Sequence, residues 1–224
     1  NDLKYLSSDE LEGRNVGSQG IARAGEFIAQ RFLDLGLRTD SFQGSPYQEF
    51  TIPGPAAMGS PESNTLAFAG ANNAAPLVLG KDFTPVSLGD SGKFDAPMVF
   101  AGYGITAPDL NYDDYAGVDV EGKVVVIVRK EPGQRDPNSK FEGNRSSQYA
   151  YFSSKELNAA LHKAAALIIV NDRLTVASAG EDQLVSVTGA GSAVTDNKIP
   201  TIFALRSAID PLLQQALGKG LDDL

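Results

Sequence analysis

The chain contains an unbroken run of branched aliphatic residues from Val124 to Val128. A strand with one face in water would show a polar residue at every second position, so this run predicts a strand buried on both faces. A second apolar run, Leu167 to Val170, predicts another strand of the same kind. Two such strands require cover on both sides of a sheet, which restricts the fold to layered arrangements with a substantial core.

A helix is predicted between these two strands. Ser153 and Glu156 have the spacing of a capping box at its start. Its buried face is predicted to consist of Leu157, Leu161, Ala164 and Ala165. The order then repeats, with a strand from Ile199 to Leu205 and a helix from about Ser207 to Leu217 that ends at Gly218. The second half of the chain is therefore predicted to have a mixed α/β fold.

The first forty residues have a helical pattern. One helix is predicted from about Gly20 to Gly36. Its apolar stripe, which we expect to face a partner, contains Ile21, Ala24, Phe27, Ile28 and Phe32. We predict two domains, a helical lead over residues 1–45 and an α/β domain over residues 46–224 with its core at about 95–217.

The net charge of the chain restricts the classes of molecule that it can bind. The formal net charge is −9, and no run of lysine or arginine is present, which disfavours nucleic acids and anionic membranes. No apolar run approaches the length of a membrane span. Peptides, proteins and small molecules remain as partners.

The sequence contains few of the residues that commonly carry catalysis. Cysteine is absent and His162 is the only histidine, so thiol catalysis and histidine-based metal sites lack the necessary groups. The segment Gly89-Asp-Ser-Gly92 has the composition of an ordinary turn. We therefore assign no catalytic residue and no metal ligand to this chain.

A long connection from Glu131 to Tyr151 is the predicted contact surface for a substrate or partner. Connections of this length without regular structure are uncommon unless they are functional or mobile. The residues proposed to make the contacts are Arg135, Lys140, Phe141, Arg145 and Tyr149.

Four aspartates, Asp109, Asp113, Asp114 and Asp119, lie close together in the sequence. Carboxylates are calcium ligands, but the spacing lacks the glycine and terminal glutamate of a helix-loop-helix site. Turn capping is the alternative interpretation, and the sequence leaves both open.

Several short motifs resemble known proteins. They are Leu11-Glu-Gly-Arg14, Gly102-Tyr-Gly104, Asp113-Asp-Tyr115, Gly122-Lys-Val124, Lys155, the segment from Ala164 to Asp172, and Ile199-Pro-Thr-Ile202. The opening resembles the zinc aminopeptidase family that includes glutamate carboxypeptidase and the transferrin receptor. Residues from about Asp95 to Leu217 resemble the protease-associated (PA) domain that many of its members carry as an insertion.

This resemblance implies a swivelling β/β/α fold that covers or flanks a peptidase active site. The zinc pair of that family is held by two histidines with aspartate and glutamate, so zinc is expected in a catalytic domain absent from this chain. We expect a non-enzymatic chain whose partners are the catalytic domain of the same parent protein and a peptide or protein substrate. The N-terminal helix could also form a homodimer.

Two alternatives remain. One is a free-standing domain that binds peptides or proteins or acts in sorting. The other is a carbohydrate-binding module, which is disfavoured because the segment from Pro53 to Phe94 has few aromatic residues at platform-like spacing. The first residue, Asn1, fits a processed protein, and we expect a secreted or periplasmic location.

Overall fold

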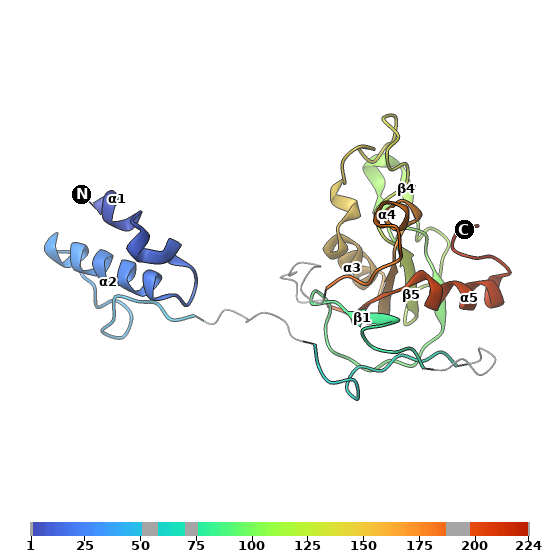
Figure 1. The fold of residues 1–224 in the computed structure, drawn as a ribbon, viewed down its shortest axis with the longest axis horizontal. Coiled ribbons are helices and arrows are strands. Elements are labelled where there is room, and N and C mark those ends of the chain that lie inside the picture. Colours follow the sequence, from blue (N-terminus) through green and yellow to red (C-terminus); the bar gives the residue numbers. More distant parts are fainter. Residues whose placement is uncertain (1, 51–57, 70–75, 187–197, 224) are drawn as a thin grey trace. The chain divides into compact units, whose positions relative to one another are not determined.

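The computed structural model describes residues 2–50, 58–69, 76–186 and 198–223. The chain divides into two compact units, Asn1–Gly54 and Pro55–Leu224, and each is described by itself (Figure 1). None of the helices in the described ranges combines the length and hydropathy that a transmembrane segment requires.

The first unit is helical. It contains α1 (Asp2–Leu6), the 3-10 segment η1 (Asp9–Arg14) and α2 (Gln19–Asp34). The Ser18 hydroxyl caps α2 by accepting a hydrogen bond from the backbone N–H of Ile21 at 3.2 Å. Gly20 allows α2 to approach η1, because a Cβ atom there would lie 1.8 Å from the carbonyl oxygen of Leu11.

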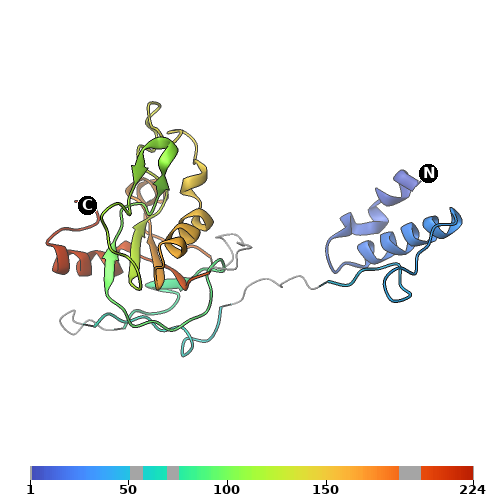
Figure 2. The same ribbon diagram turned by 180° about the vertical axis from the view of Figure 1, so that it is seen from behind.

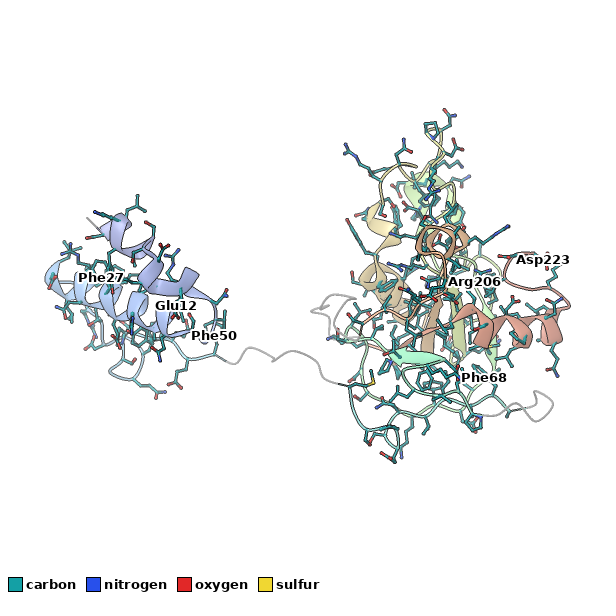
Figure 3. All side chains as sticks on the ribbon, in the orientation of Figure 1. Glu12, Phe27, Phe50, Phe68, Arg206 and Asp223 are labelled. Atoms are coloured by element: carbon teal, nitrogen blue, oxygen red, sulfur yellow. The ribbon has the colours of Figure 1, made fainter. Side chains whose placement is uncertain are left out.

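Side chains join α1 to α2. The rings of Tyr5 and Phe27 have centroids 4.6 Å apart, and the Arg31 guanidinium pairs with Asp2 at 2.6 Å. Figure 3 shows Phe27 among the side chains of this unit. The helix predicted from about Gly20 to Gly36 is thus present as α2. Residues of the same unit, such as Tyr5, pack on part of its apolar stripe.

A five-stranded sheet forms the centre of the second unit. Its strands are β1 (Phe83–Pro85), β2 (Met98–Phe100), β5 (Val124–Val128), β6 (Ala166–Val170) and β7 (Thr201–Ala204). Their order is β1-β7-β6-β5-β2, and all are parallel except β1. Every residue of β5 and β6 is buried, so the two strands predicted from unbroken apolar runs are confirmed.

A helix covers each face of this sheet (Figures 1 and 2). The face that includes Val126 and Ile168 packs against Ile209 and Leu213 of α5 (Arg206–Leu217). The opposite face, with Val125 and Ile127, belongs to a second core that includes Ala159 of α3 (Phe152–Leu161). These layers confirm the predicted mixed α/β fold class.

A small hairpin and short helical segments complete the unit. The hairpin strands are β3 (Thr106–Ala107) and β4 (Tyr112–Asp113), joined through η2 (Pro108–Leu110). Two further segments are η3 (Gln148–Ala150), just before α3, and α4 (Arg173–Ala179), just after β6. The hairpin packs over a third small core built from Ile105, Ala107 and Phe141.

The predicted start of α3 is wrong, and so is Leu161 in its predicted buried face, whereas Ala164, which follows the helix, is buried as predicted. The N-cap is Tyr151, without a side-chain cap, and the carboxylate of Glu156 instead accepts a hydrogen bond from the backbone N–H of Ile199 at 3.0 Å. Leu161 is 65% exposed. The helix buries Lys155, Glu156 and Ala159 instead, because the small alanine allows close approach to the sheet.

Candidate functional site

Polar residues gather where the parallel strands end. The turns that follow β2, β5, β6 and β7 supply Tyr103, Arg129, Glu131, Asn171, Asp172 and Arg206. In open α/β sheets this carboxyl edge is where ligands commonly bind. Functional groups of this unit are therefore expected at this edge.

Lys155 reaches this edge from α3 and is only 1% exposed. Its Nζ atom donates a hydrogen bond to the carbonyl oxygen of Tyr103 at 2.5 Å and lies 5.8 Å from the centre of that ring. Burial lowers the pKa of Lys155 to about 7, although Asp114, Glu131 and Asp172 act in the opposite direction. The hydrogen bond from Lys155 therefore fixes the turn after β2, although burial of the ammonium group loses the free energy of its hydration.

Asp114 holds the other side of the same turn. Its carboxylate accepts hydrogen bonds from the backbone N–H groups of Tyr103 and Ile105, at 3.1 and 3.0 Å, and from the Tyr112 hydroxyl at 2.7 Å. Burial raises the pKa of Asp114, and these hydrogen bonds oppose the rise. Gly104 has a φ of +66° and no room for a Cβ atom beside Ile127. The turn is therefore fixed by its own sequence and by its neighbours.

Three other polar groups of the edge, Arg129, Asn171 and Arg206, are linked by hydrogen bonds, whereas Glu131 accepts from Ser147 and Asp172 from Thr175. Asn171 accepts a hydrogen bond from Arg129 at 3.1 Å and donates one to Asp182 at 2.8 Å. Arg206, labelled in Figure 3, donates to the carbonyl oxygen of Asn171 at 2.9 Å and also pairs with Asp222. These contacts tie the ends of β5, β6 and β7 together, which is a structural role.

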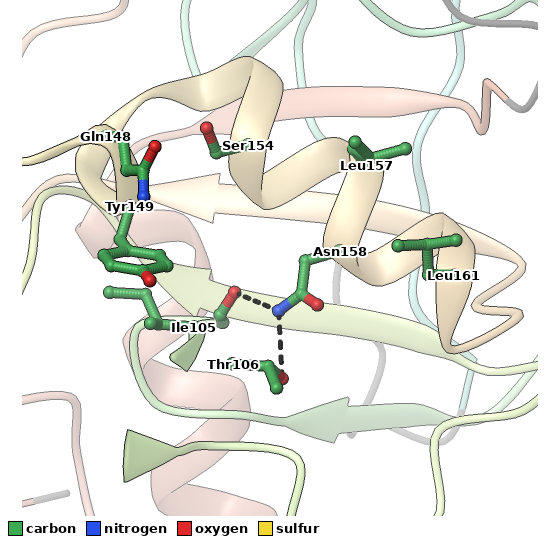
Figure 4. A pocket seen from close by; sticks show the side chains of 9 residues that line it. Ile105, Thr106, Gln148, Tyr149, Ser154, Leu157, Asn158 and Leu161 are labelled. Carbon is green, nitrogen blue, oxygen red and sulfur yellow. Dashed lines mark hydrogen bonds between the residues drawn. The ribbon is translucent and has the colours of Figure 1, made fainter. Parts of the chain in front are cut away.

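A groove lies beside this edge, between α3 and the start of the hairpin (Figure 4). Its volume is about 200 Å³. The residues that line it come from three segments of the chain, and they are Gly104, Ile105, Thr106, Gln148, Tyr149, Ser154, Leu157, Asn158 and Leu161. The turn held by Lys155 and Asp114 therefore forms part of its wall.

The groove combines apolar surface with a few polar groups. Leu157 and Leu161 project from α3 along one side, and Tyr149 lies at one end (Figure 4). The amide nitrogen of Asn158 donates to the carbonyl oxygen of Gly104 at 3.0 Å and to the Thr106 hydroxyl at 3.3 Å. The amide oxygen of Asn158 is turned away from both partners (Figure 4), so it can accept a hydrogen bond from a ligand.

Only part of the predicted contact loop, Glu131 to Tyr151, is exposed to solvent. Arg135, Lys140 and Arg145 are exposed, but Phe141 is 3% exposed and belongs to the small core under the hairpin. The assignment of Phe141 as a contact residue is therefore wrong, because its ring packs edge-on against Tyr112 at 5.0 Å. Tyr149, the fifth predicted residue, lines the groove.

The apolar stripe of α2 is divided between buried and exposed residues. Ala24 is buried and Phe27 is half-buried. Ile21, Ile28 and Phe32 are 42%, 40% and 46% exposed. The three exposed residues are the part of this predicted surface that a partner could reach.

The four clustered aspartates have separate partners. Asp113 accepts from the Thr106 hydroxyl and the backbone N–H of Tyr115, at 2.9 and 3.0 Å. Asp119 pairs with Lys123 at 2.9 Å, and Asp109 accepts from the Tyr149 hydroxyl at 2.5 Å. These contacts, together with those of Asp114, match the turn-capping interpretation.

The zinc pair implied by the sequence resemblance does not fit the residues of this chain. His162 follows α3, its ring stacks on Tyr115 at 4.1 Å, and its Nδ1 atom lies 2.9 Å from the carbonyl oxygen of Asn158. In the part of the chain that the structure describes, no three His, Asp or Glu side chains form a group that could hold a metal ion.

Sequence reasoning missed the groove because it placed Leu157 and Leu161 in the core. The signal for the correct face was present in Ala159, since a small residue marks the side of a helix that lies closest to a sheet. Thr106 and Asn158 gave no local signal, because their contact joins segments far apart in the sequence.

The comparison with family models shows the family of this chain. The family model for the PA domain matches residues 74–212. Similar solved structures include an aminopeptidase from Aneurinibacillus sp. strain AM-1, at 20% identity and a TM-score of 0.45, and BSAP, a zinc aminopeptidase from Bacillus subtilis, at 17% and 0.39. Each alignment covers 96% of this chain, which spans 40% of the other chain. A comparison with curated proteins finds no match.

Proposed function

This chain belongs to the PA domain family, and from that premise we propose that it is a non-catalytic domain that contacts peptides or proteins for a peptidase. The observation that supports this role best is the groove between α3 and the hairpin. It exposes leucine side chains beside groups that can hydrogen-bond to a peptide backbone. Apolar surface with a few placed polar groups is the general character of a binding site.

We propose that the peptidase is a zinc-dependent aminopeptidase. The support is the resemblance of residues 1–45 to the opening of that family, including Leu11-Glu-Gly-Arg14. In such a protein, zinc would be bound by a separate catalytic domain, and the PA domain would govern which substrates enter. A secreted or periplasmic location is part of this proposal.

A peptide-binding experiment tests the groove. The full chain, labelled with ¹⁵N, is titrated with a mixture of extended peptides, and the backbone amide shifts are followed by NMR. We expect shifts at residues 104–106, 148–149 and 154–161. The variant Leu161→Asp should abolish them, because it places a charge on the apolar wall.

The matched control for this test is Leu217→Asp. Leu217 is 53% exposed on α5, the helix that covers the opposite face of the sheet. We expect this variant to bind like the wild type. Binding that survives Leu161→Asp, or shifts that cluster elsewhere, would refute the groove as the contact site.

A second test concerns the parent protein. If the reading frame continues into a segment with two histidines and several acidic residues, the aminopeptidase proposal gains direct support. A parent protein without such a segment would instead favour a free-standing binding or sorting domain, for which the same groove would serve.

A further inference from the structure

Two exposed carboxylates are connected to the wall of the groove. The Thr106 hydroxyl donates to Asp113 at 2.9 Å, and the Tyr149 hydroxyl donates to Asp109 at 2.5 Å. Both Thr106 and Tyr149 line the groove. Asp109 and Asp113 belong to one hairpin, in η2 and β4, and each contacts a residue that lines the groove, so we refer to the two carboxylates as the acidic rim.

This rim has no internal counter-charge. Within the described ranges, neither Asp109 nor Asp113 takes part in an ion pair, and their hydrogen bonds come from hydroxyl and backbone N–H groups. Other carboxylates of the same unit are paired, since Asp119 binds Lys123 and Glu121 binds Lys163. The rim therefore adds a local negative potential to a chain whose net charge is −9.

One lysine lies near the hairpin without neutralising the rim. The Nζ atom of Lys140 contacts the carbonyl oxygen of Leu110 at 3.4 Å, and its other contacts do not include an ion pair within the described residues. Asp114, the next carboxylate, faces inward and is compensated by Lys155. Within the described residues, Asp109 and Asp113 are thus exposed carboxylates that no cation contacts directly.

The size of the groove restricts what it can hold. A volume of about 200 Å³ is below the range of roughly 300 to 1,000 Å³ that is usual for drug-sized ligands. It suits a single large side chain instead. Leu157, Leu161 and Ile105 favour an apolar side chain, and the amide oxygen of Asn158, which points away from Gly104 and Thr106, can accept a backbone N–H beside it (Figure 4).

We propose that the groove recognises a peptide in which an apolar residue stands next to lysine or arginine. The apolar side chain enters the groove, and the adjacent cation pairs with Asp109 and Asp113. This inference rests on the proposed peptide-contact function and adds a sequence preference to it. Acidic peptides are disfavoured, because the rim repels them.

The test compares three synthetic peptides of equal length with blocked ends. One contains Leu-Lys-Leu-Arg at its centre, one replaces both cations by glutamate, and one replaces both leucines by serine. Affinity for the full chain is measured by fluorescence anisotropy at low and at physiological salt. We expect the first peptide to bind at least about fivefold more tightly than either of the others, with a preference that weakens as salt screens the rim.

The double variant Asp109→Asn and Asp113→Asn removes the charges and keeps hydrogen-bond acceptors. It should bind the cationic and acidic peptides with similar affinity. The control Asp119→Asn removes an aspartate of the same sequence cluster, and we expect it to keep the wild-type preference. Circular dichroism checks that both variants are folded, and the salt dependence of the wild type provides a readout that needs no variant.

The outcomes separate this inference from the proposed function. If the wild type binds the leucine peptides equally well whatever their charge, and Leu161→Asp abolishes binding, then the contact function stands and the charge preference is wrong. If the serine peptide binds as tightly as the leucine peptide, the apolar part of the preference is wrong. If the wild type binds none of the three, both proposals are refuted.

Discussion

The Nζ atom of Lys155 donates a hydrogen bond to the carbonyl oxygen of Tyr103 at 2.5 Å, which ties α3 to the turn after β2. Three positions further along α3, Asn158 donates to the carbonyl oxygen of Gly104 at 3.0 Å. Residues three apart share one face of a helix, so the two bonds act side by side. The width of the neighbouring groove depends on them, because Gly104 and Asn158 both line it.

The buried lysine should make stability depend on pH. In the folded chain Lys155 loses its proton near pH 7, whereas its ordinary pKa is 10.5. Between these values the unfolded chain binds more protons, so the free energy of unfolding should rise with pH. Lys155→Met should remove a rise on the order of 2 to 3 kcal/mol between pH 7 and 9.5.

Urea denaturation at a series of pH values measures this difference. The control is Lys163→Met, which removes an exposed lysine paired with Glu121 and should leave the pH profile close to that of the wild type. Parallel profiles for the wild type and Lys155→Met would contradict the prediction.

Asp114 and Asp119 should differ in their contribution to stability, although they are close in sequence. Asp114→Ala leaves two backbone N–H groups and the Tyr112 hydroxyl without their acceptor. We expect a loss of about 2 to 4 kcal/mol in the free energy of unfolding. Asp119→Ala removes only a surface pair with Lys123, and its denaturation midpoint should stay near that of the wild type. Equal midpoints would show that Asp114 does not hold the turn.

Gly104 should tolerate alanine less well than Gly117 does. Both have a positive φ, of +66° and +76°, so both substitutions strain the backbone. At Gly104 the new Cβ atom would also lie 2.8 Å from Cγ2 of Ile127, whereas at Gly117 nothing lies within 4 Å. We expect a loss of about 1 kcal/mol for Gly117→Ala and about 2 to 4 kcal/mol for Gly104→Ala, measured by thermal denaturation.

The exposed part of the α2 stripe should mediate self-association. Ile28 and Phe32 lie one turn apart and are both at least 40% exposed. Neighbouring exposed apolar side chains favour burial against a second copy of the chain. Sedimentation equilibrium should detect a dimer that the double variant Ile28→Asp and Phe32→Asp dissociates. Val16→Asp, at a residue that is 81% exposed and outside the helix, is the control and should remain dimeric. A wild type that is monomeric at high concentration would refute the prediction.

The purified chain should neither bind zinc tightly nor hydrolyse aminoacyl substrates. It contains a single histidine, and a co-catalytic zinc pair needs several ligands in fixed geometry. Isothermal titration with zinc and an assay with leucine p-nitroanilide test both parts, with a catalytically active zinc aminopeptidase as the positive control. Zinc-dependent turnover by this chain would overturn the assignment.

The α2 helix and the buried strands could be predicted from local patterns. The run Val124–Val128 and the stripe around Phe27 show their periodicity within a few residues, and periodicity follows directly from backbone geometry. The start of α3 was mispredicted because it depends on a contact between residues that are distant in the sequence. Glu156 has the spacing of a cap, but the backbone N–H of Ile199, which is distant in sequence, takes its carboxylate.

The sequence by itself determined three strands of the central sheet (β5, β6 and β7), the lack of a histidine pair, and the resemblance to the PA domain. Tertiary structure alone decided which face of α3 is buried, that Phe141 belongs to the core, and that Asp109 and Asp113 stand beside a groove. The physical reason is that a groove forms between segments that the chain brings together only on folding. Thr106 and Asn158 are adjacent only because folding brings α3 against the segment that follows the Gly102–Gly104 turn.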